Sequence, residues 1–135
     1  MHDELLAFLI DDDLDDHEFF SMVMEETYPS IQCAFATDGV QALEKLNANP
    51  SFIPNIILID VNMPRMNGID CLAEIKKLPH LHQSHIYMYS TSADPLMVEQ
   101  SRVLGACGFI KKEPTTEALQ KKFLEVISKF KITLP

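Results

Sequence analysis

Charged and hydroxyl side chains stand directly after several short apolar runs of this sequence. The run at 5–10 is followed by three aspartates, Asp11 to Asp13, and the run at 55–59 is followed by Asp60. Later runs are followed by Ser90 and Thr91, and by Lys111 and Lys112. Carboxylates that crowd together repel one another and resist ionisation unless a cation neutralises them. Mg²⁺ does this well, because it prefers oxygen ligands and shares them with phosphate oxygens. The residue types therefore indicate a magnesium-dependent phosphate site.

Asp60 is the candidate nucleophile of such a site. A carboxylate can attack phosphorus and form an aspartyl phosphate. The metal and a lysine ammonium would neutralise charge on the transferring phosphoryl group, while a hydroxyl would donate a hydrogen bond to one of its oxygens. Ser90 or Thr91 offers the hydroxyl, and Lys111 or Lys112 offers the ammonium.

The fold must bring these positions together. Strand-length apolar runs lie at 5–10, 31–36, 55–60, 86–90 and 107–111. Stretches with helical spacing lie between and after them, at about 14–28, 38–47, from 67, from 94 and at 115–130. This alternation predicts an α/β fold with a parallel sheet, right-handed crossovers and helices on both faces. Ligands of such sheets bind at the carboxyl ends of the strands, so the polar residues are expected to share one crevice.

Length, composition and charge restrict the function classes. The 135 residues, 47% hydrophobic and 23% charged, are expected to form a single domain over 1–135, with the tail at 131–135 too short for an output module. A net charge of −9 disfavours nucleic acid and anionic membranes as partners. The apolar runs are too short to cross a bilayer and the first five residues lack a basic signal-peptide region, so we expect a cytoplasmic protein. The three cysteines are expected to be mostly buried, unreactive side chains.

Three segments together resemble the bacterial two-component response-regulator receiver domain. "FLIDDD" at 8–13 resembles the first strand and acidic pair of that family, and "IILIDVNMPRMNGID" at 56–70 resembles its phosphoacceptor segment. "SRVLGACGFIKKEPT" at 101–115 resembles the region from its fourth helix to its fifth strand. The resemblance implies a doubly wound, flavodoxin-like (βα)5 fold with strand order 2-1-3-4-5. It also implies a stand-alone, chemotaxis-regulator-like receiver with no fused output domain.

The resemblance implies roles for individual residues. Asp60 would accept a phosphoryl group from a phosphohistidine on a sensor histidine kinase or a histidine phosphotransfer protein. Asp11 and Asp12 would match the acidic pair that holds Mg²⁺, with Asp12 the more direct ligand and Asp11 acting partly through water. The backbone carbonyl of Asn62 would also bind the metal. The remaining matches are Ser90 as the switch hydroxyl, Lys112 as the lysine that pairs with the phosphate, and Phe109 as the switch aromatic.

One segment departs from the family pattern. The family usually has Lys-Pro after the fifth strand, with a cis peptide bond, whereas this chain has Lys112-Glu113-Pro114. A cis bond before Glu113 would cost about 3 kcal/mol. Either the site carries that cost, or the loop is trans and locally rearranged. Phe109 also lacks the hydroxyl of the tyrosine that is common at its position.

These observations predict a phosphorylation-controlled switch and not an enzyme that releases a product. Phosphorylation is expected to reshape the face formed by the fourth helix, the fifth strand and the fifth helix, and so to change binding of a downstream protein. A degenerate receiver that binds partners without phosphorylation is one alternative. A small aspartyl-nucleophile phosphatase is another, although that class usually has a second aspartate where this chain has Asn62.

Two other polar clusters have simpler interpretations. Asp13, Asp15 and Asp16 are expected mainly to start a helix, where negative charge is favourable. His80, His82 and His85 have a spacing that could suit zinc, but on a polar loop we expect solvated histidines.

Overall fold

Within residues 5–130, which the computed structural model describes, five strands alternate with five helices. The strands are β1 (Leu6–Ile10), β2 (Gln32–Ala36), β3 (Ile56–Asp60), β4 (His85–Ser90) and β5 (Gly108–Lys111). The helices are α1 (Leu14–Thr27), α2 (Gly39–Ala48), α3 (Gly68–Ile75), α4 (Pro95–Val103) and α5 (Thr116–Ile127). The expected alternation is confirmed. A short 3₁₀ turn, η1 (Pro79–Leu81), was not expected. The expectations about a signal peptide and about the tail concern 1–4 and 131–135, which lie outside the described residues.

The five strands form one parallel sheet in the order β2-β1-β3-β4-β5, as predicted. The central strand β3 is buried along its whole length, because its apolar residues face helices on both sides. All strands run in the same direction, so their carboxyl ends meet at one edge of the sheet. That edge carries the polar residues singled out above.

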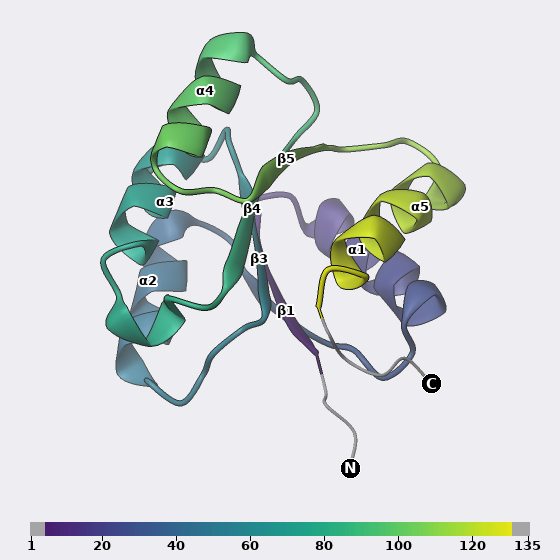
Figure 1. Cartoon of the computed structure of the whole chain (residues 1–135), viewed down its shortest axis with the longest axis horizontal. Helices are drawn as coiled ribbons and strands as arrows, with labels where there is room; N and C mark the ends of the chain where they lie inside the picture. Colours follow the sequence, from purple (N-terminus) through teal and green to yellow (C-terminus); the bar gives the residue numbers. More distant parts are fainter. Residues whose placement is uncertain (1–4, 131–135) are drawn as a thin grey trace.

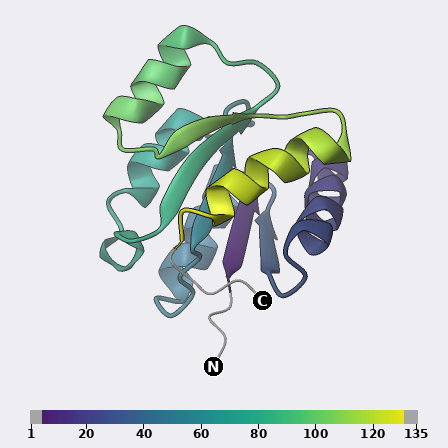
Figure 2. The same ribbon diagram turned by 45° about the vertical axis from the view of Figure 1, so that its right-hand side comes forward.

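Helices cover both faces of the sheet. Helices α1 and α5 lie side by side on one face, and α2, α3 and α4 cover the other (Figures 1 and 2). The rings of Phe20 in α1 and Phe123 in α5 meet edge to face at 5.2 Å. Neighbouring residues of β1 point to opposite cores, Leu9 toward α1 and α5 and Phe8 toward α2 and α3. This two-sided burial makes β1 and β3 rigid supports for the residues at their ends.

Polar side chains begin each helix. The N-cap residues are Asp13, Asp38, Asn67, Asp94 and Thr115, and each accepts a hydrogen bond from a backbone N–H of the first turn. The helix-start interpretation of Asp13 is thereby confirmed. None of the helices in the described part of the chain is long and apolar enough to span a membrane.

The histidines and cysteines correct two sequence expectations. His82 is exposed as expected, but His80 and His85 are half-buried, and the His85 ring stacks on Phe130 at 4.4 Å. No group of metal-ligating atoms among residues 5–130 includes these histidines. Of the cysteines, Cys107 is exposed, because it lies in the connection between α4 and β5.

Candidate functional site

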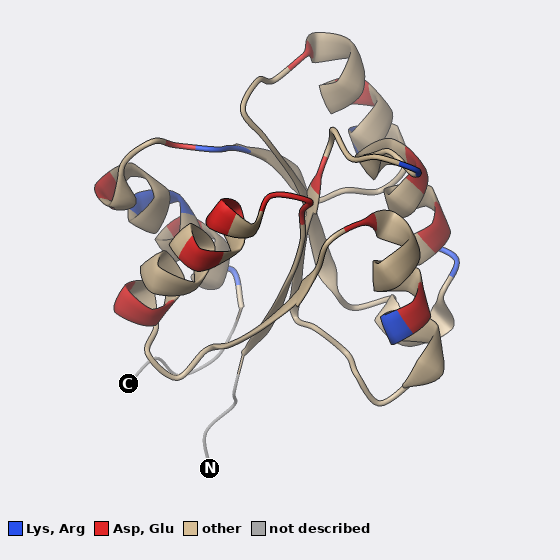
Figure 3. Ribbon diagram, turned by 180° about the vertical axis from the view of Figure 1, so that it is seen from behind, with Lys and Arg blue, Asp and Glu red and all other residues tan. Residues whose placement is uncertain are grey.

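Acidic and basic side chains from distant parts of the chain meet at the carboxyl edge of the sheet. The acidic segment after β1 and the lysines at the end of β5 lie at the same end of the molecule (Figure 3). Asp60 is the last residue of β3. In the sheet β3 lies between β1, which the acidic segment follows, and the β4-β5 side, where the lysines lie. The parallel topology therefore produces the crevice that the strand-end pattern predicted.

Three carboxylates form a compact cluster in this crevice. One oxygen from each of Asp11, Asp12 and Asp60 lies within 4.8 Å of the others. Asp11 is completely buried and Asp60 is 6% exposed, whereas Asp12 faces solvent. Backbone N–H groups support two of the three, since Asp13 donates to Asp11 at 2.9 Å and Asn62 donates to Asp60 at 3.3 Å.

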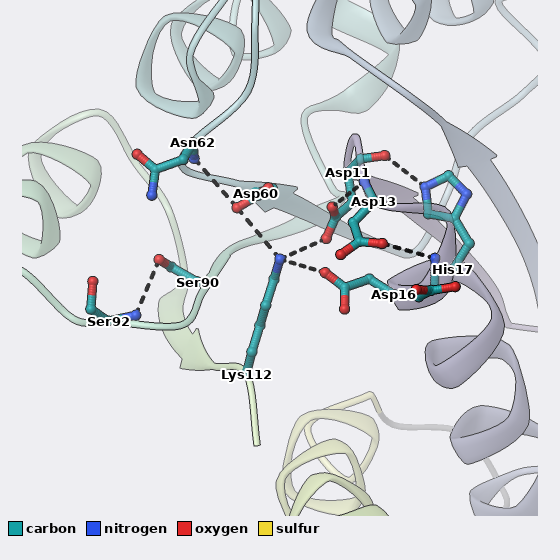
Figure 4. Close-up of polar contacts among 10 residues, drawn as sticks. Asp11, Asp13, Asp16, His17, Asp60, Asn62, Ser90, Ser92 and Lys112 are labelled. Carbon is teal, nitrogen blue, oxygen red and sulfur yellow. Dashed lines mark hydrogen bonds and ion pairs between the residues drawn. The ribbon is translucent and has the colours of Figure 1, made fainter. Parts of the chain in front are cut away.

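Lys112 extends from the end of β5 into the middle of the carboxylates (Figure 4). Its Nζ donates a hydrogen bond to Asp16 Oδ2 at 2.7 Å. It lies 2.9 Å from Asp11 Oδ2 and 3.6 Å from Asp60 Oδ1, which are ion-pair distances. The ammonium also lies 5.3 Å from the ring centroid of Tyr89, which forms an apolar floor beneath it. One cation thus faces three carboxylates.

Burial shifts the ionisation of these groups. Burial, reinforced by the negative charge of Asp11, raises the pKa of Asp60 to about 7, although Lys112 opposes the shift. Burial also raises the pKa of Asp11. For Lys112, burial lowers the pKa, but its contacts with Asp16 and Asp11 outweigh that effect and the net pKa is raised. Lys112 is therefore protonated at neutral pH, whereas Asp60 keeps its proton up to about pH 7.

The donor set fits a divalent cation. All three grouped ligands are carboxylates, the oxygen donors that hard cations prefer. Asp11 Oδ2 is buried, and its neighbour is the Lys112 ammonium at 2.9 Å, so this oxygen already lies against positive charge, as a metal ligand would. A bound cation would also lower the pKa of Asp60, because its positive charge would stabilise the ionised carboxylate that burial has separated from water.

Ser90 and Thr91 differ in their placement. Ser90 ends β4 and is 2% exposed, and its hydroxyl oxygen accepts a long hydrogen bond from the Ser92 N–H at 3.4 Å. Its carbonyl accepts from the backbone N–H of Lys112 at 2.7 Å, which ties the ends of β4 and β5 together. Thr91 is exposed. Ser90 is therefore the hydroxyl that lies at the sheet edge beside the crevice.

The turn after Asp60 brings α3 very close to β3. The Gly68 N–H donates to the Val61 carbonyl at 2.9 Å. A Cβ on Gly68 would lie 2.3 Å from the carbonyl oxygen of Asp60, closer than any side-chain carbon can approach. Asn62 lies within this turn and is exposed. Glycine at 68 is thus required by the approach of two backbones.

The end of β5 answers the question about the lysines. No cis peptide bond occurs in the described part of the chain, so Lys112-Glu113 is trans. Lys112 points into the carboxylates in this trans form, and Lys111 is exposed. Phe109 is half-buried and packs against the core on the side of α2, α3 and α4.

Asp16 is the site residue that the sequence interpretation missed. Its carboxylate was expected mainly to favour the start of α1, but it binds Lys112. No local pattern identifies it, because the acidic pair lies before α1 and helical periodicity does not relate that pair to Asp16.

Comparisons with known proteins agree with this geometry. A profile of the response regulator receiver domain matches residues 7–124. The chain is 36% identical to the transcriptional regulatory protein CpxR homolog of Haemophilus influenzae over 73 residues, 54% of this chain and 30% of that protein. It is 33% identical to the chemotaxis protein CheY1 of Helicobacter pylori over 92 residues, 68% of this chain and 72% of that protein.

Solved structures share the fold. The phosphorylated cyanobacterial phytochrome response regulator RcpA superposes with a TM-score of 0.84 at 24% identity, covering 96% of this chain and 99% of the other. The Mn²⁺-bound response regulator Rcp1 superposes with a TM-score of 0.77 at 26% identity, covering 97% and 99%. The chain spans about a third of the length of several curated relatives, including 33% of a protein-glutamate methylesterase/protein-glutamine glutaminase of Pyrococcus horikoshii.

Proposed function

Because this chain belongs to the response regulator receiver domain family, we propose that it is a phosphorylation-controlled switch of two-component signalling. Asp60 is the proposed phosphoacceptor. The observation that carries the proposal is the position of its carboxylate, which ends the central strand within 4.8 Å of oxygens from Asp11 and Asp12 and 3.6 Å from the Lys112 ammonium.

The proposed donor is a phosphohistidine on a sensor histidine kinase or a histidine phosphotransfer protein. The Asp60 carboxylate attacks phosphorus, a P–O bond to Asp60 forms, and the P–N bond to the donor histidine breaks as that imidazole takes up a proton. Lys112 neutralises charge on the transferring group from the β5 side, since its pKa is raised and it carries a full charge. The buried position of Asp60 limits access of water to the acyl phosphate.

Asp11, Asp12 and Asp60, with the backbone carbonyl of Asn62, are the proposed ligands of Mg²⁺. When bound, Mg²⁺ would supply positive charge to the carboxylate and to the phosphoryl oxygens. Asp12 is exposed and free to turn toward the cation, while Asp11 is fixed by burial and by the Asp13 N–H. The raised pKa of Asp60 supports this assignment, because a neighbouring cation is needed to keep the nucleophile ionised at neutral pH.

Ser90 and Phe109 are the proposed switch residues. Within residues 5–130, the bond recorded for the Ser90 hydroxyl is the long one that its oxygen accepts from Ser92, so a more negative acceptor at Asp60 would attract the hydroxyl proton. Phe109 is half-buried, so a small rotation of its side chain would move the ring from the core toward solvent. Movement of both would alter the face of α4, β5 and α5, where Leu96, Val103 and Leu124 are exposed.

We propose a downstream protein as the partner of that face, with the signal passing in the cytoplasm. The proposed chemistry ends with the phosphorylation and dephosphorylation of this chain, without turnover of an external substrate. The net charge of −9 makes nucleic acid and anionic membrane surfaces poor partners for it.

The test is incubation with acetyl phosphate, and separately with beryllium fluoride, with and without Mg²⁺. Intact-protein mass spectrometry should detect one added phosphoryl group, and ¹⁹F NMR should detect one bound beryllofluoride, only when Mg²⁺ is present. Asp60→Asn should abolish both signals. Asp15→Asn is the matched control, because Asp15 is exposed in the first turn of α1 and should leave them unchanged.

Two outcomes would contradict the proposal. Absence of modification in the wild-type protein would favour a receiver that binds partners without phosphorylation. Multiple turnover of phosphomonoesters would favour a phosphatase.

A further inference from the structure

The N-cap of α1 does not use the Asp16 carboxylate. Asp13 is the N-cap of the helix, and its carboxylate accepts the Asp15 N–H at 2.9 Å. The Asp16 N–H is bonded to the Asp13 carbonyl. The Asp16 carboxylate is turned inward, with 28% of the side chain exposed, and its contact is the Lys112 ammonium at 2.7 Å.

The three carboxylates around Lys112 are not equivalent partners. Asp16 accepts a hydrogen bond from Nζ at 2.7 Å, and Asp11 Oδ2, just before α1, lies nearly as close at 2.9 Å. Asp60 Oδ1 is farthest away, at 3.6 Å, which exceeds the range of a charge-assisted hydrogen bond. In the unphosphorylated chain Lys112 is thus drawn toward α1 and away from the proposed acceptor (Figure 4).

We propose that Asp16 is a positioning residue: its carboxylate holds the Lys112 ammonium on the α1 side of the site until Asp60 is phosphorylated. Its functional consequence rests on the proposed function. A phosphoryl group adds charge and three strong acceptor oxygens at Asp60. Lys112 must then leave Asp16 to pair with it, so the Asp16 contact opposes the switched state. When Lys112 leaves Asp16, the first turn of α1 loses its contact with the end of β5. Phosphorylation of Asp60 therefore changes the contacts of α1.

The first experiment is structural and needs no phosphorylation. In a crystal structure of Asp16→Asn, Lys112 Nζ should move to within about 3 Å of an Asp60 oxygen. In Asp15→Asn, which removes the same charge from the same helical turn, Lys112 should stay where it is. A lysine that remains in place in Asp16→Asn overturns the inference.

The second experiment measures the consequence for switching. Asp16→Asn should lower the beryllium fluoride concentration for half-saturation by about twofold to fivefold, since a partly exposed ion pair is weak. Asp16→Glu, which keeps the carboxylate, should restore the wild-type value, and Asp15→Asn should not change it. In a Lys112→Ala background Asp16→Asn should have no further effect, because the two residues act through one contact.

The possible failures are distinguishable. Weaker or unchanged beryllium fluoride binding by Asp16→Asn, beside a wild-type protein that binds it, contradicts the positioning role. A wild-type protein that binds none, combined with a displaced Lys112 in the Asp16→Asn crystal, contradicts the proposed function and leaves the placement of Lys112 by Asp16 established.

Discussion

At the scale of single residues, folding buries carboxylates of the site close to one another, which is electrostatically unfavourable. Asp60 and Asp11 are buried next to each other, and the Lys112 ammonium that lies against them is shared with Asp16. The pKa of Asp60 is consequently raised from 3.8 to about 7, with burial the largest cause. Ionised Asp60 therefore destabilises the metal-free fold, and this penalty depends on pH.

The pH dependence has a definite sign. In the unfolded chain Asp60 loses its proton near pH 4, but in the folded chain it keeps the proton to about pH 7. The folded state binds more protons within this window, so the metal-free protein loses stability as pH rises through it. In EDTA, urea unfolding should show Asp60→Asn to be more stable than wild type at pH 8, on the order of 2 kcal/mol. The difference should disappear below pH 4. Equal stabilities of the two proteins at pH 8 would contradict the raised pKa.

At the scale of elements, the start of α3 determines where the acceptor turn lies. The backbone of Gly68 packs on the carbonyl of Asp60, so helix and strand are in direct contact at the site. Gly39 occupies the equivalent first position of α2, but the three atoms nearest to a Cβ there belong to the flexible side chain of Met66. Neither glycine has a positive φ, so they differ in packing alone.

The two glycines offer a matched pair of substitutions. Gly68→Ala should lower the free energy of unfolding by about 2–3 kcal/mol, because a backbone must shift to admit the new carbon. It should also weaken beryllium fluoride binding, since the shift displaces Asp60. Gly39→Ala should change stability by less than about 1 kcal/mol. Chemical denaturation of both variants checks this, and similar effects of the two would show that the close approach at Gly68 is unimportant.

At the scale of the whole molecule, negative charge is in excess, and part of it lies at one edge of the sheet. The net charge is −9, and at the end of the sheet three carboxylates surround one ammonium, with Asp12 close to two of them. Any salt will screen the general repulsion, but only a cation that is bound at the site will relieve the repulsion there.

Magnesium should therefore stabilise the fold beyond what ionic strength does. At a free concentration about ten times Kd, Mg²⁺ should add about 1.4 kcal/mol to the free energy of unfolding. NaCl at the same ionic strength should add less, and Asp12→Asn should remove the difference between the two salts. Thermal unfolding at pH 7.5 measures all three conditions. Identical curves in MgCl₂ and NaCl for the wild type would argue against a metal site.

Much of the fold was predictable from local patterns. Apolar strand-length runs, helical spacing and cap residues are properties of neighbouring residues, and all five strands and helices were placed to within a few positions. The α/β alternation restricts the connections, because parallel neighbours need right-handed crossovers. The 3₁₀ turn at Pro79–Leu81 and the burial of His85 under Phe130 depend on packing, and they were not predicted.

The sequence by itself determined which residues end each strand, and therefore that Asp11, Asp12, Asp60, Ser90 and Lys112 share one edge. Only the tertiary structure decided which carboxylates Lys112 contacts and at what distances. It alone also decided that the Lys112-Glu113 bond is trans. The reason is physical. A strand end is specified by local sequence, whereas a long flexible ammonium side chain takes the position that the field of all nearby charges and the surrounding packing make lowest in energy. Asp16 belongs to that field, although 96 residues separate it from Lys112 along the chain.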